Sequence, residues 1–120
     1  MAKNLEISFL LDFYGSMLTE KQRNVVEYYY NDDLSLAEIA AHVGITRQGV
    51  RDSIKRAEAQ LFDMEQRLGL ARRFREMKAG LEQIHLAAVY IEEYNQLTLR
   101  SPEVEQNVQC ILQIAQSLCD

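Results

Sequence analysis

The amino-acid sequence predicts an all-α protein. Its 120 residues include a single proline and five glycines, whereas the strong helix formers Ala, Leu, Glu and Gln are plentiful. It contains no alternating apolar–polar run bounded by turn residues, which is the pattern of a β-hairpin. Apolar residues make up 48% of the chain, so a packed core is expected and disorder is not. The length fits one domain, or one small domain with an extended element.

The first predicted helix covers about residues 5–18. Apolar residues recur there at spacings of three and four, and others between them widen the apolar face. So broad a face predicts burial against another element, in the same chain or in a second one. Residues 1–18 are therefore assigned to an N-terminal packing or dimerisation helix. Its apolar residues are Ile7, Leu10, Leu11, Phe13, Tyr14, Met17 and Leu18.

Two capping boxes, at residues 19–22 and 35–38, predict two further helix starts. In each, a hydroxyl accepts a backbone N–H that has no partner inside the helix, and the Gln or Glu three residues later reaches back. The first of these helices is expected to end near Tyr30, because the run Asn-Asp-Asp at residues 31–33 favours a turn.

The second capping box begins a short helix that is expected to end near His42. A tight turn centred on Gly44 follows, and Thr46 caps the next helix. Two short helices joined by a glycine-centred turn form a helix-turn-helix, which we place at residues 36–56.

The helix after Thr46 is expected to be long. Its apolar residues continue at three- and four-residue spacing up to Gly69, which is a stop signal, and two more helices with the same spacing follow. We assign residues 19–68 to a helix-turn-helix with an extended recognition helix, and residues 69–120 to a C-terminal helical bundle packed along heptad seams. Periodicity leaves open whether these seams are an intramolecular core or a dimer interface. The seam residues are Ile54, Ala57, Leu61, Met64 and Leu68, then Phe74, Met77, Leu81, Ile84, Ala88 and Ile91, then Val104, Asn107, Ile111, Ile114 and Leu118.

Charge is distributed unevenly along the chain. The net charge is −5, but residues 46–80 carry nine basic and five acidic groups, whereas residues 1–45 carry three and seven and residues 81–120 carry one and six. The acidic total weakens non-specific attraction to DNA. The positive charge nevertheless gathers around the predicted recognition helix, which favours a local nucleic-acid contact.

The predicted recognition helix has an apolar face and a polar face. Inward residues are expected to be Val50, Ile54 and Ala57, with Ile45 just ahead, packed on Leu36, Ile39, Ala40 and Val43. The polar face supplies the candidate DNA-binding residues, which are Thr46, Arg47, Gln48, Arg51, Asp52, Lys55 and Arg56.

Each type of residue on this polar face suits a different DNA contact. Arg51 can donate two hydrogen bonds to guanine and Gln48 can pair with adenine, whereas Lys55 and Arg56 suit backbone phosphates. Thr46 and the helix N-terminus suit a phosphate as well. The alternative is that this is only a solvated helix face of mixed charge.

An enzyme, a metal site and a bound cofactor are not expected. His42 and His85 are isolated, and the chain has no phosphate-binding loop or nucleophile motif. Cys110 and Cys119 lack the spacing of a disulfide framework or a zinc site. The sequence shows no signal peptide and no apolar run long enough to span a bilayer, so a cytoplasmic protein is expected.

Several motifs resemble known bacterial families. The stretch from Leu18 to Gln48 resembles region four of bacterial sigma factors, and roughly residues 9–70 more closely resemble the YlxM family of small helix-turn-helix proteins. The residues that carry the second resemblance are Asp12, Phe13, Tyr14, Leu18, Thr19, Glu20, Lys21, Gln22, Tyr28, Tyr29, Tyr30, Asn31, Asp32, Asp33, Ser35, Leu36, Ala37, Glu38, Ile39, Ala40, Thr46, Arg47, Gln48, Gly49, Val50, Asp52, Ile54, Lys55, Arg56 and Glu58.

The resemblance implies a DNA-binding protein of transcription regulation that is dimeric. In that family the genes typically neighbour those of the signal recognition particle, so the resemblance also implies a connection with that pathway and its components as partners. The alternative function is an accessory of the particle that binds protein or RNA and not a specific DNA.

Overall fold

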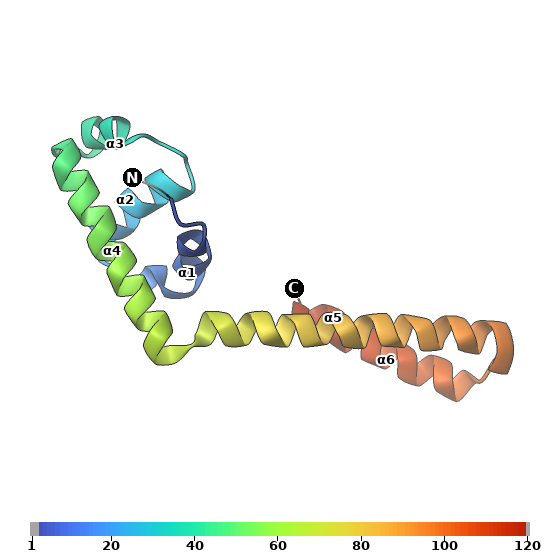
Figure 1. Cartoon of the computed structure of the whole chain (residues 1–120). Helices are drawn as coiled ribbons and strands as arrows, with labels where there is room; N and C mark the ends of the chain where they lie inside the picture. The colour runs from blue at the N-terminus through green and yellow to red at the C-terminus, as the bar shows by residue number, and fades with distance from the viewer. Residues whose placement is uncertain (1–2, 120) are drawn as a thin grey trace. The chain divides into compact units, whose positions relative to one another are not determined.

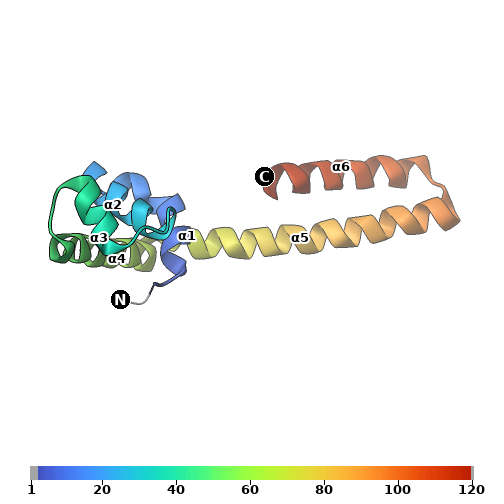
Figure 2. The ribbon, with the colours of Figure 1, turned by 90° about the horizontal axis from the view of Figure 1, so that it is seen from above.

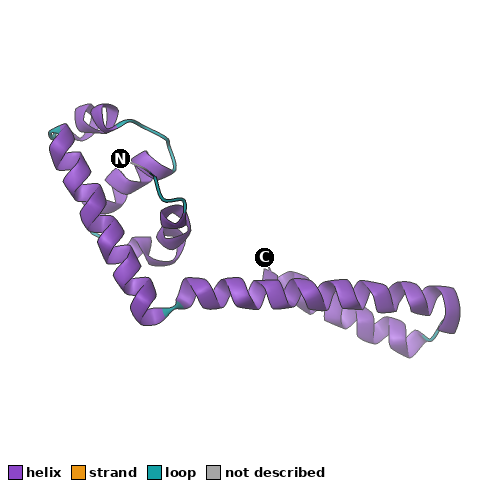
Figure 3. Cartoon of the chain, viewed as in Figure 1, coloured by secondary structure: helices purple, strands orange, loops and turns teal. Residues whose placement is uncertain are grey.

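The computed structural model describes residues 3–119 and is all-α, as predicted (Figures 1 and 3). Its packing divides the chain into two compact units, Met1–Arg72 and Arg73–Asp120. The predicted packing helix and the helix-turn-helix thus belong to one unit. The elements in chain order are α1 (Glu6–Tyr14), a 3₁₀ turn (Gly15–Met17), α2 (Glu20–Tyr30), α3 (Leu36–Val43), α4 (Arg47–Leu68), α5 (Leu70–Tyr94), a π turn (Asn95–Leu99) and α6 (Pro102–Cys119).

Local hydrogen bonds set the helix ends at the predicted places. Both capping boxes form: the side chain of Thr19 accepts from the Gln22 amide at 3.2 Å, and that of Ser35 accepts from the Glu38 amide at 3.1 Å. At the other ends, Gly44 closes α3 with φ of +77° and Gly69 closes α4 with φ of +64°. Both are left-handed conformations that glycine adopts without steric penalty.

Helix α1 is shorter than predicted because its last turn is 3₁₀. The tighter turn changes the angular step between residues, so Met17 leaves the apolar face and is 61% exposed. Leu10 and Tyr14 are buried in one cluster with Ala57 and Leu61 of α4. The apolar face of α1 is therefore covered inside its own chain.

Helix α4 contacts all three other α-helices of this unit, α1, α2 and α3. Four inward residues at three- and four-residue spacing are fully buried: Val50, Ile54, Ala57 and Leu61. A second apolar cluster joins Val50 and Ile54 to Ile39 and Ala40 of α3 and to residues of α2, as the expected helix-turn-helix packing requires. Ile45 was expected to point inward but is 37% exposed.

The unit Arg73–Asp120 is a two-helix hairpin, in which α6 runs back along α5 (Figure 2). Its buried residues are Ala88, Asn95, Val108 and Ala115. Most of the predicted seam is not packed between the two helices: Met77, Ile84, Ile91, Ile111, Ile114 and Leu118 are 41–65% exposed. Two helices bury only a narrow line of contact, which small residues occupy here. The expected bundle core is therefore incomplete within the described chain.

Candidate nucleic-acid interface

The seven candidate DNA-binding residues lie on the first ten residues of α4 and at its cap, and all are exposed. Residues 47, 51 and 55 are one helical turn apart, and so are residues 48, 52 and 56, so the side chains form two adjacent rows. The opposite side of the same segment carries the buried Val50 and Ile54. One face of this segment of α4 is thus buried in the core, and the other face is exposed and accessible to a ligand.

The start of α4 is shaped by Thr46, Gly49 and Ile45. The Thr46 hydroxyl accepts a hydrogen bond from the Gly49 amide at 2.9 Å and caps the helix. A Cβ added at Gly49 would lie 3.2 Å from that hydroxyl oxygen and 3.5 Å from Cδ1 of Ile45. Gly49 therefore leaves room for the cap, and the neighbouring Ile45 lies beside the first turn of α4.

The amide of Gln48 is held by Asp52. Gln48 Nε2 donates to Asp52 Oδ1 at 2.9 Å, one helical turn away. A primary amide has two N–H donors and a carbonyl acceptor, so one N–H and the carbonyl stay free. These are the two groups that pair with the N7 and N6 of adenine. Asp52 therefore fixes the orientation of Gln48 while leaving its base-pairing groups available.

The four basic side chains of this face form no salt bridge within residues 3–119. They are Arg47, Arg51, Lys55 and Arg56. By contrast, Arg67 farther along α4 pairs with Asp63 at 3.0 Å. The first turn of α4 also has no acidic residue, so nothing neutralises the positive end of the helix dipole there. The face is cationic and accessible.

Two tyrosine–glutamate hydrogen bonds hold α4 against the rest of its unit. The Tyr30 hydroxyl of α2 donates to Glu58 at 2.8 Å, and the Tyr14 hydroxyl of α1 donates to Glu65 at 2.7 Å. Burial, with the carboxylate of Glu58 beside it, raises the pKa of Tyr30 to about 12. Burial and the Glu65 hydrogen bond raise the pKa of Tyr14 as well. Both hydroxyls thus remain donors at neutral pH.

Glu65 also caps the start of α5. Its carboxylate accepts from the amides of Ala71 and Arg72, each at 3.0 Å, while the Tyr14 hydroxyl accepts from the Leu70 amide at 3.1 Å. Burial opposes the ionisation of Glu65, but the hydrogen bonds from Tyr14 and the two amides outweigh it and lower the pKa of Glu65. Nothing in the sequence signals this contact, because Tyr14 and Glu65 are 51 residues apart.

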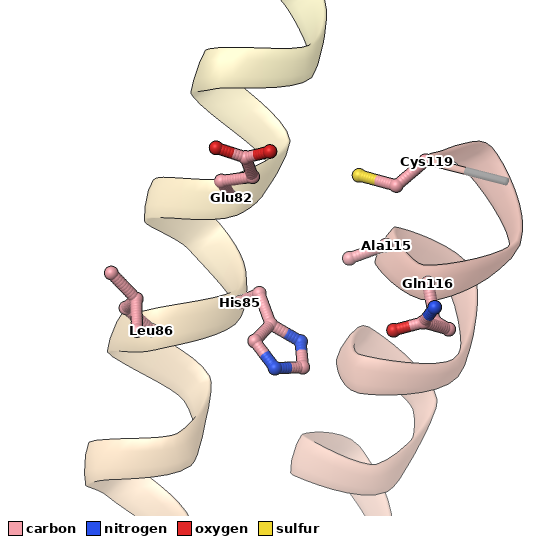
Figure 4. A pocket seen from close by; sticks show the side chains of 6 residues that line it. All are labelled: Glu82, His85, Leu86, Ala115, Gln116 and Cys119. Carbon is pink, nitrogen blue, oxygen red and sulfur yellow. The ribbon is translucent and has the colours of Figure 1, made fainter.

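The histidines and cysteines do not assemble into a second site. His42 lies exposed on α3, with its ring edge-on to Tyr28 at 4.9 Å between centroids. His85 and Cys119 line a shallow groove between α5 and α6 (Figure 4). Among residues 3–119, no three His, Cys, Asp or Glu side chains lie where they could jointly hold a metal ion.

The chain matches a family model along most of its length. Residues 1–101 match the family described as "UPF0122: Putative helix-turn-helix protein, YlxM / p13 like". The chain belongs to this YlxM-like family. It is 48% identical over 85 residues to a UPF0122 protein of Shouchella clausii, covering 71% of this chain and 78% of the relative. It is 42% identical over 105 residues to one of Acetivibrio thermocellus, covering 88% and 85%.

The family match confirms the resemblance drawn from the motifs and covers the whole helix-turn-helix. It ends just before α6, so the whole of the hairpin's second helix lies outside the matched residues. Within the described residues, no helix combines the length and apolarity needed to cross a membrane.

Proposed function

We propose that this YlxM-like protein is a non-enzymatic, DNA-binding regulatory protein that works as a homodimer in the bacterial cytoplasm. The observation that supports DNA binding most directly is the exposed face of α4, where four cations without salt-bridge partners surround an oriented Gln48. A cationic helix face held rigidly against a small core is the element that enters a major groove in helix-turn-helix proteins.

The proposed contacts divide into base recognition and phosphate binding. Gln48 and Arg51 lie in the first two turns of α4, where adenine and guanine edges come within reach. Arg47, Lys55 and Arg56, with Thr46 at the cap, contact phosphates on the two sides of the groove. Asp52 keeps Gln48 in place and accepts from cytosine N4 where a cytosine is adjacent.

Dimerisation would extend the interface over more base pairs. A single recognition helix contacts few base pairs, whereas two related by a two-fold axis meet successive major grooves when they lie about 34 Å apart. The target would then be a palindromic site. We include homodimer formation in the proposal on this ground and on the exposed apolar residues of the hairpin.

The DNA-binding proposal is tested by fluorescence anisotropy on mixed-sequence duplex DNA, followed by selection of preferred sequences. The logarithm of the wild-type association constant should fall linearly with the logarithm of salt concentration, with a slope near −0.9 for each phosphate neutralised. Lys55→Ala should weaken binding to all sequences and reduce that slope by about one phosphate. Arg51→Ala should lose preference at one base position, which corresponds to about 1–3 kcal/mol.

Arg67→Ala is the matched control, because it removes an exposed arginine from the same helix outside the proposed face. It should bind as wild type does. A second arm uses the RNA of the signal recognition particle at the same salt concentrations. Binding to that RNA without binding to DNA would overturn the proposal and favour the accessory role in the particle pathway. Equal losses in Arg51→Ala and Arg67→Ala would show that the α4 face is not the interface.

A further inference from the structure

The hairpin of α5 and α6 carries an apolar stripe that its own two helices do not cover. The stripe comprises Met77, Ile84, Ile91, Ile111, Ile114 and Leu118, whose side chains are 41–65% exposed. On α5 these residues follow heptad spacing, and so do those on α6. Met77, Ile84 and Leu118 line one groove between the helices, so the two rows lie on the same side of the hairpin.

The opposite side of the hairpin differs in chemistry. There the groove is lined by three polar side chains, Glu82, His85 and Gln116, together with Leu86, Ala115 and Cys119 (Figure 4). The groove on the side of the stripe is lined by one charged residue, Lys78, and otherwise by apolar residues and Gly80. Helix α6 has no charged residue from residue 107 to residue 119. A solvated helix face normally carries charges. The stripe is therefore the face that a partner covers.

The hairpin also lacks a core of its own. Neither apolar core cluster found within residues 3–119 extends beyond Ala71, and only four of the described residues of the hairpin are buried. Helices of this kind draw most of their stability from tertiary packing of their apolar face. The exposed heptad stripe on each of two antiparallel helices is half of a four-helix bundle core.

The charges of the hairpin indicate which partner fits. Its open end, residues 73–80, carries three basic and one acidic residue, whereas its closed end, residues 90–106, carries four acidic and one basic. A second copy turned end for end places each basic end beside an acidic one. Such a pair is attractive at both ends, as a two-fold interface requires.

The size of the stripe also fits a second copy. With roughly 170 Å² for each large apolar side chain, the exposed parts come to about 500 Å² on each copy. A symmetric pair would bury about 1,000 Å² from the stripe alone, which is the minimum expected of a biological interface. Gly80 and Ala87, one turn to either side of Ile84, are small and let another helix approach.

We propose that two copies of this chain pair through the apolar stripe, with their hairpins antiparallel, to form a four-helix bundle. This inference rests on the homodimer part of the proposed function and is independent of DNA binding. The bundle joins two helix-turn-helix units through α5.

Sedimentation equilibrium of the full chain tests the surface. The wild type should have twice the chain mass of 13.9 kDa, and Ile84→Glu, which buries a charge in the stripe, should have the mass of one chain. The matched control is Leu86→Glu, the same kind of change at a side chain that is 69% exposed and lines the opposite groove. It should stay dimeric. Circular dichroism checks that both variants remain helical.

The possible outcomes distinguish a failure of the proposed dimer surface from a failure of the proposed function. If the Ile84→Glu variant is still a dimer, or if Leu86→Glu disrupts the dimer equally, the apolar stripe is not the dimer interface. The proposal that the chain is a homodimer is unaffected by either result. A wild-type monomer at every concentration overturns both. Loss of DNA binding in Arg51→Ala with an intact dimer bears only on the α4 face.

Cysteine cross-linking tests the orientation, in a chain with Cys110→Ser and Cys119→Ser. Residues 73 and 94 lie about 30 Å apart along α5 at 1.5 Å per residue. In an antiparallel pair, Arg73→Cys and Tyr94→Cys should each fail to cross-link alone and should form a disulfide when the two variants are mixed. Cross-linking of Arg73→Cys with itself would indicate parallel hairpins and overturn the antiparallel arrangement.

Discussion

The two units of this protein use the same apolar periodicity in different ways. In Met1–Arg72, residues spaced by three and four along α4 are fully buried against three other helices. In the hairpin, six large apolar residues with the same spacing along α5 and α6 remain 41–65% exposed. The difference lies in the number of neighbours: α4 has three packing partners in its own unit, and α5 has one. A heptad pattern therefore indicates that a helix face is apolar, but it does not predict which element covers that face.

The largest expected difference between the two units is the response to truncating a leucine. Leu61→Ala removes a fully buried side chain and should lower the free energy of unfolding by about 2–5 kcal/mol. Leu86→Ala, at a side chain that is 69% exposed, should change it by less than about 0.5 kcal/mol. Urea unfolding at one fixed protein concentration measures both. Similar losses would show that the hairpin has a core of its own.

A tyrosine hydroxyl should matter in the first unit and not in the second. Tyr14→Phe removes one of the three donors to Glu65, leaving only the Ala71 and Arg72 amides, and leaves the Leu70 amide without the Tyr14 oxygen as its acceptor. It should lower the free energy of unfolding by about 1.5–3 kcal/mol. Tyr90→Phe, in the hairpin at 69% exposure, is the control and should be neutral. If Tyr14→Phe were also neutral, the Tyr14–Glu65 bond would not hold α4 in place.

A smaller effect is expected at the cap of α4. Thr46→Ala removes the acceptor for the Gly49 amide and should lower stability by about 1 kcal/mol. Hydrogen exchange of the first turn of α4 should accelerate, while exchange around the buried Leu61 changes by no more than the global loss. Thr46→Ser keeps the hydroxyl and should restore slow exchange. Unchanged exchange in Thr46→Ala would mean that the hydroxyl does not cap the helix.

Titration of Tyr30 does not change the free energy of unfolding at neutral pH. It should lower the free energy of unfolding only at alkaline pH. The folded chain holds the Tyr30 proton until about pH 12, whereas the unfolded chain releases it near the ordinary pKa of 10.0. The unfolded state then binds fewer protons, so stability should be constant with respect to this group below pH 10 and fall between pH 10 and about pH 12. Tyr30→Phe should reduce that slope. An equally steep decline in Tyr30→Phe would assign the alkaline loss to other groups.

Much of the first unit could be predicted because its signals are local. The two capping boxes, the Thr46 cap and the stop at Gly69 each involve residues within four positions of one another, and all four lie where expected. The polar face of α4 was predictable for the same reason, since seven side chains on one helix follow from its periodicity. The exposure of Ile45 was not, because its side chain lies beside Gly49 on the first turn of α4, a contact that helical periodicity does not describe.

The sequence alone determined where the helices begin and end, that residues 36–56 form a helix-turn-helix, and which side chains of α4 face away from the core. These properties follow from hydrogen bonds and side-chain spacing within one or two helical turns. Only the tertiary structure decided that the apolar face of α1 is covered by α4, that Tyr14 reaches Glu65, and that the stripe of the hairpin is left uncovered. Burial depends on which surfaces come into contact in the folded chain. The local sequence pattern does not predict a contact between residues 51 positions apart, such as Tyr14 and Glu65.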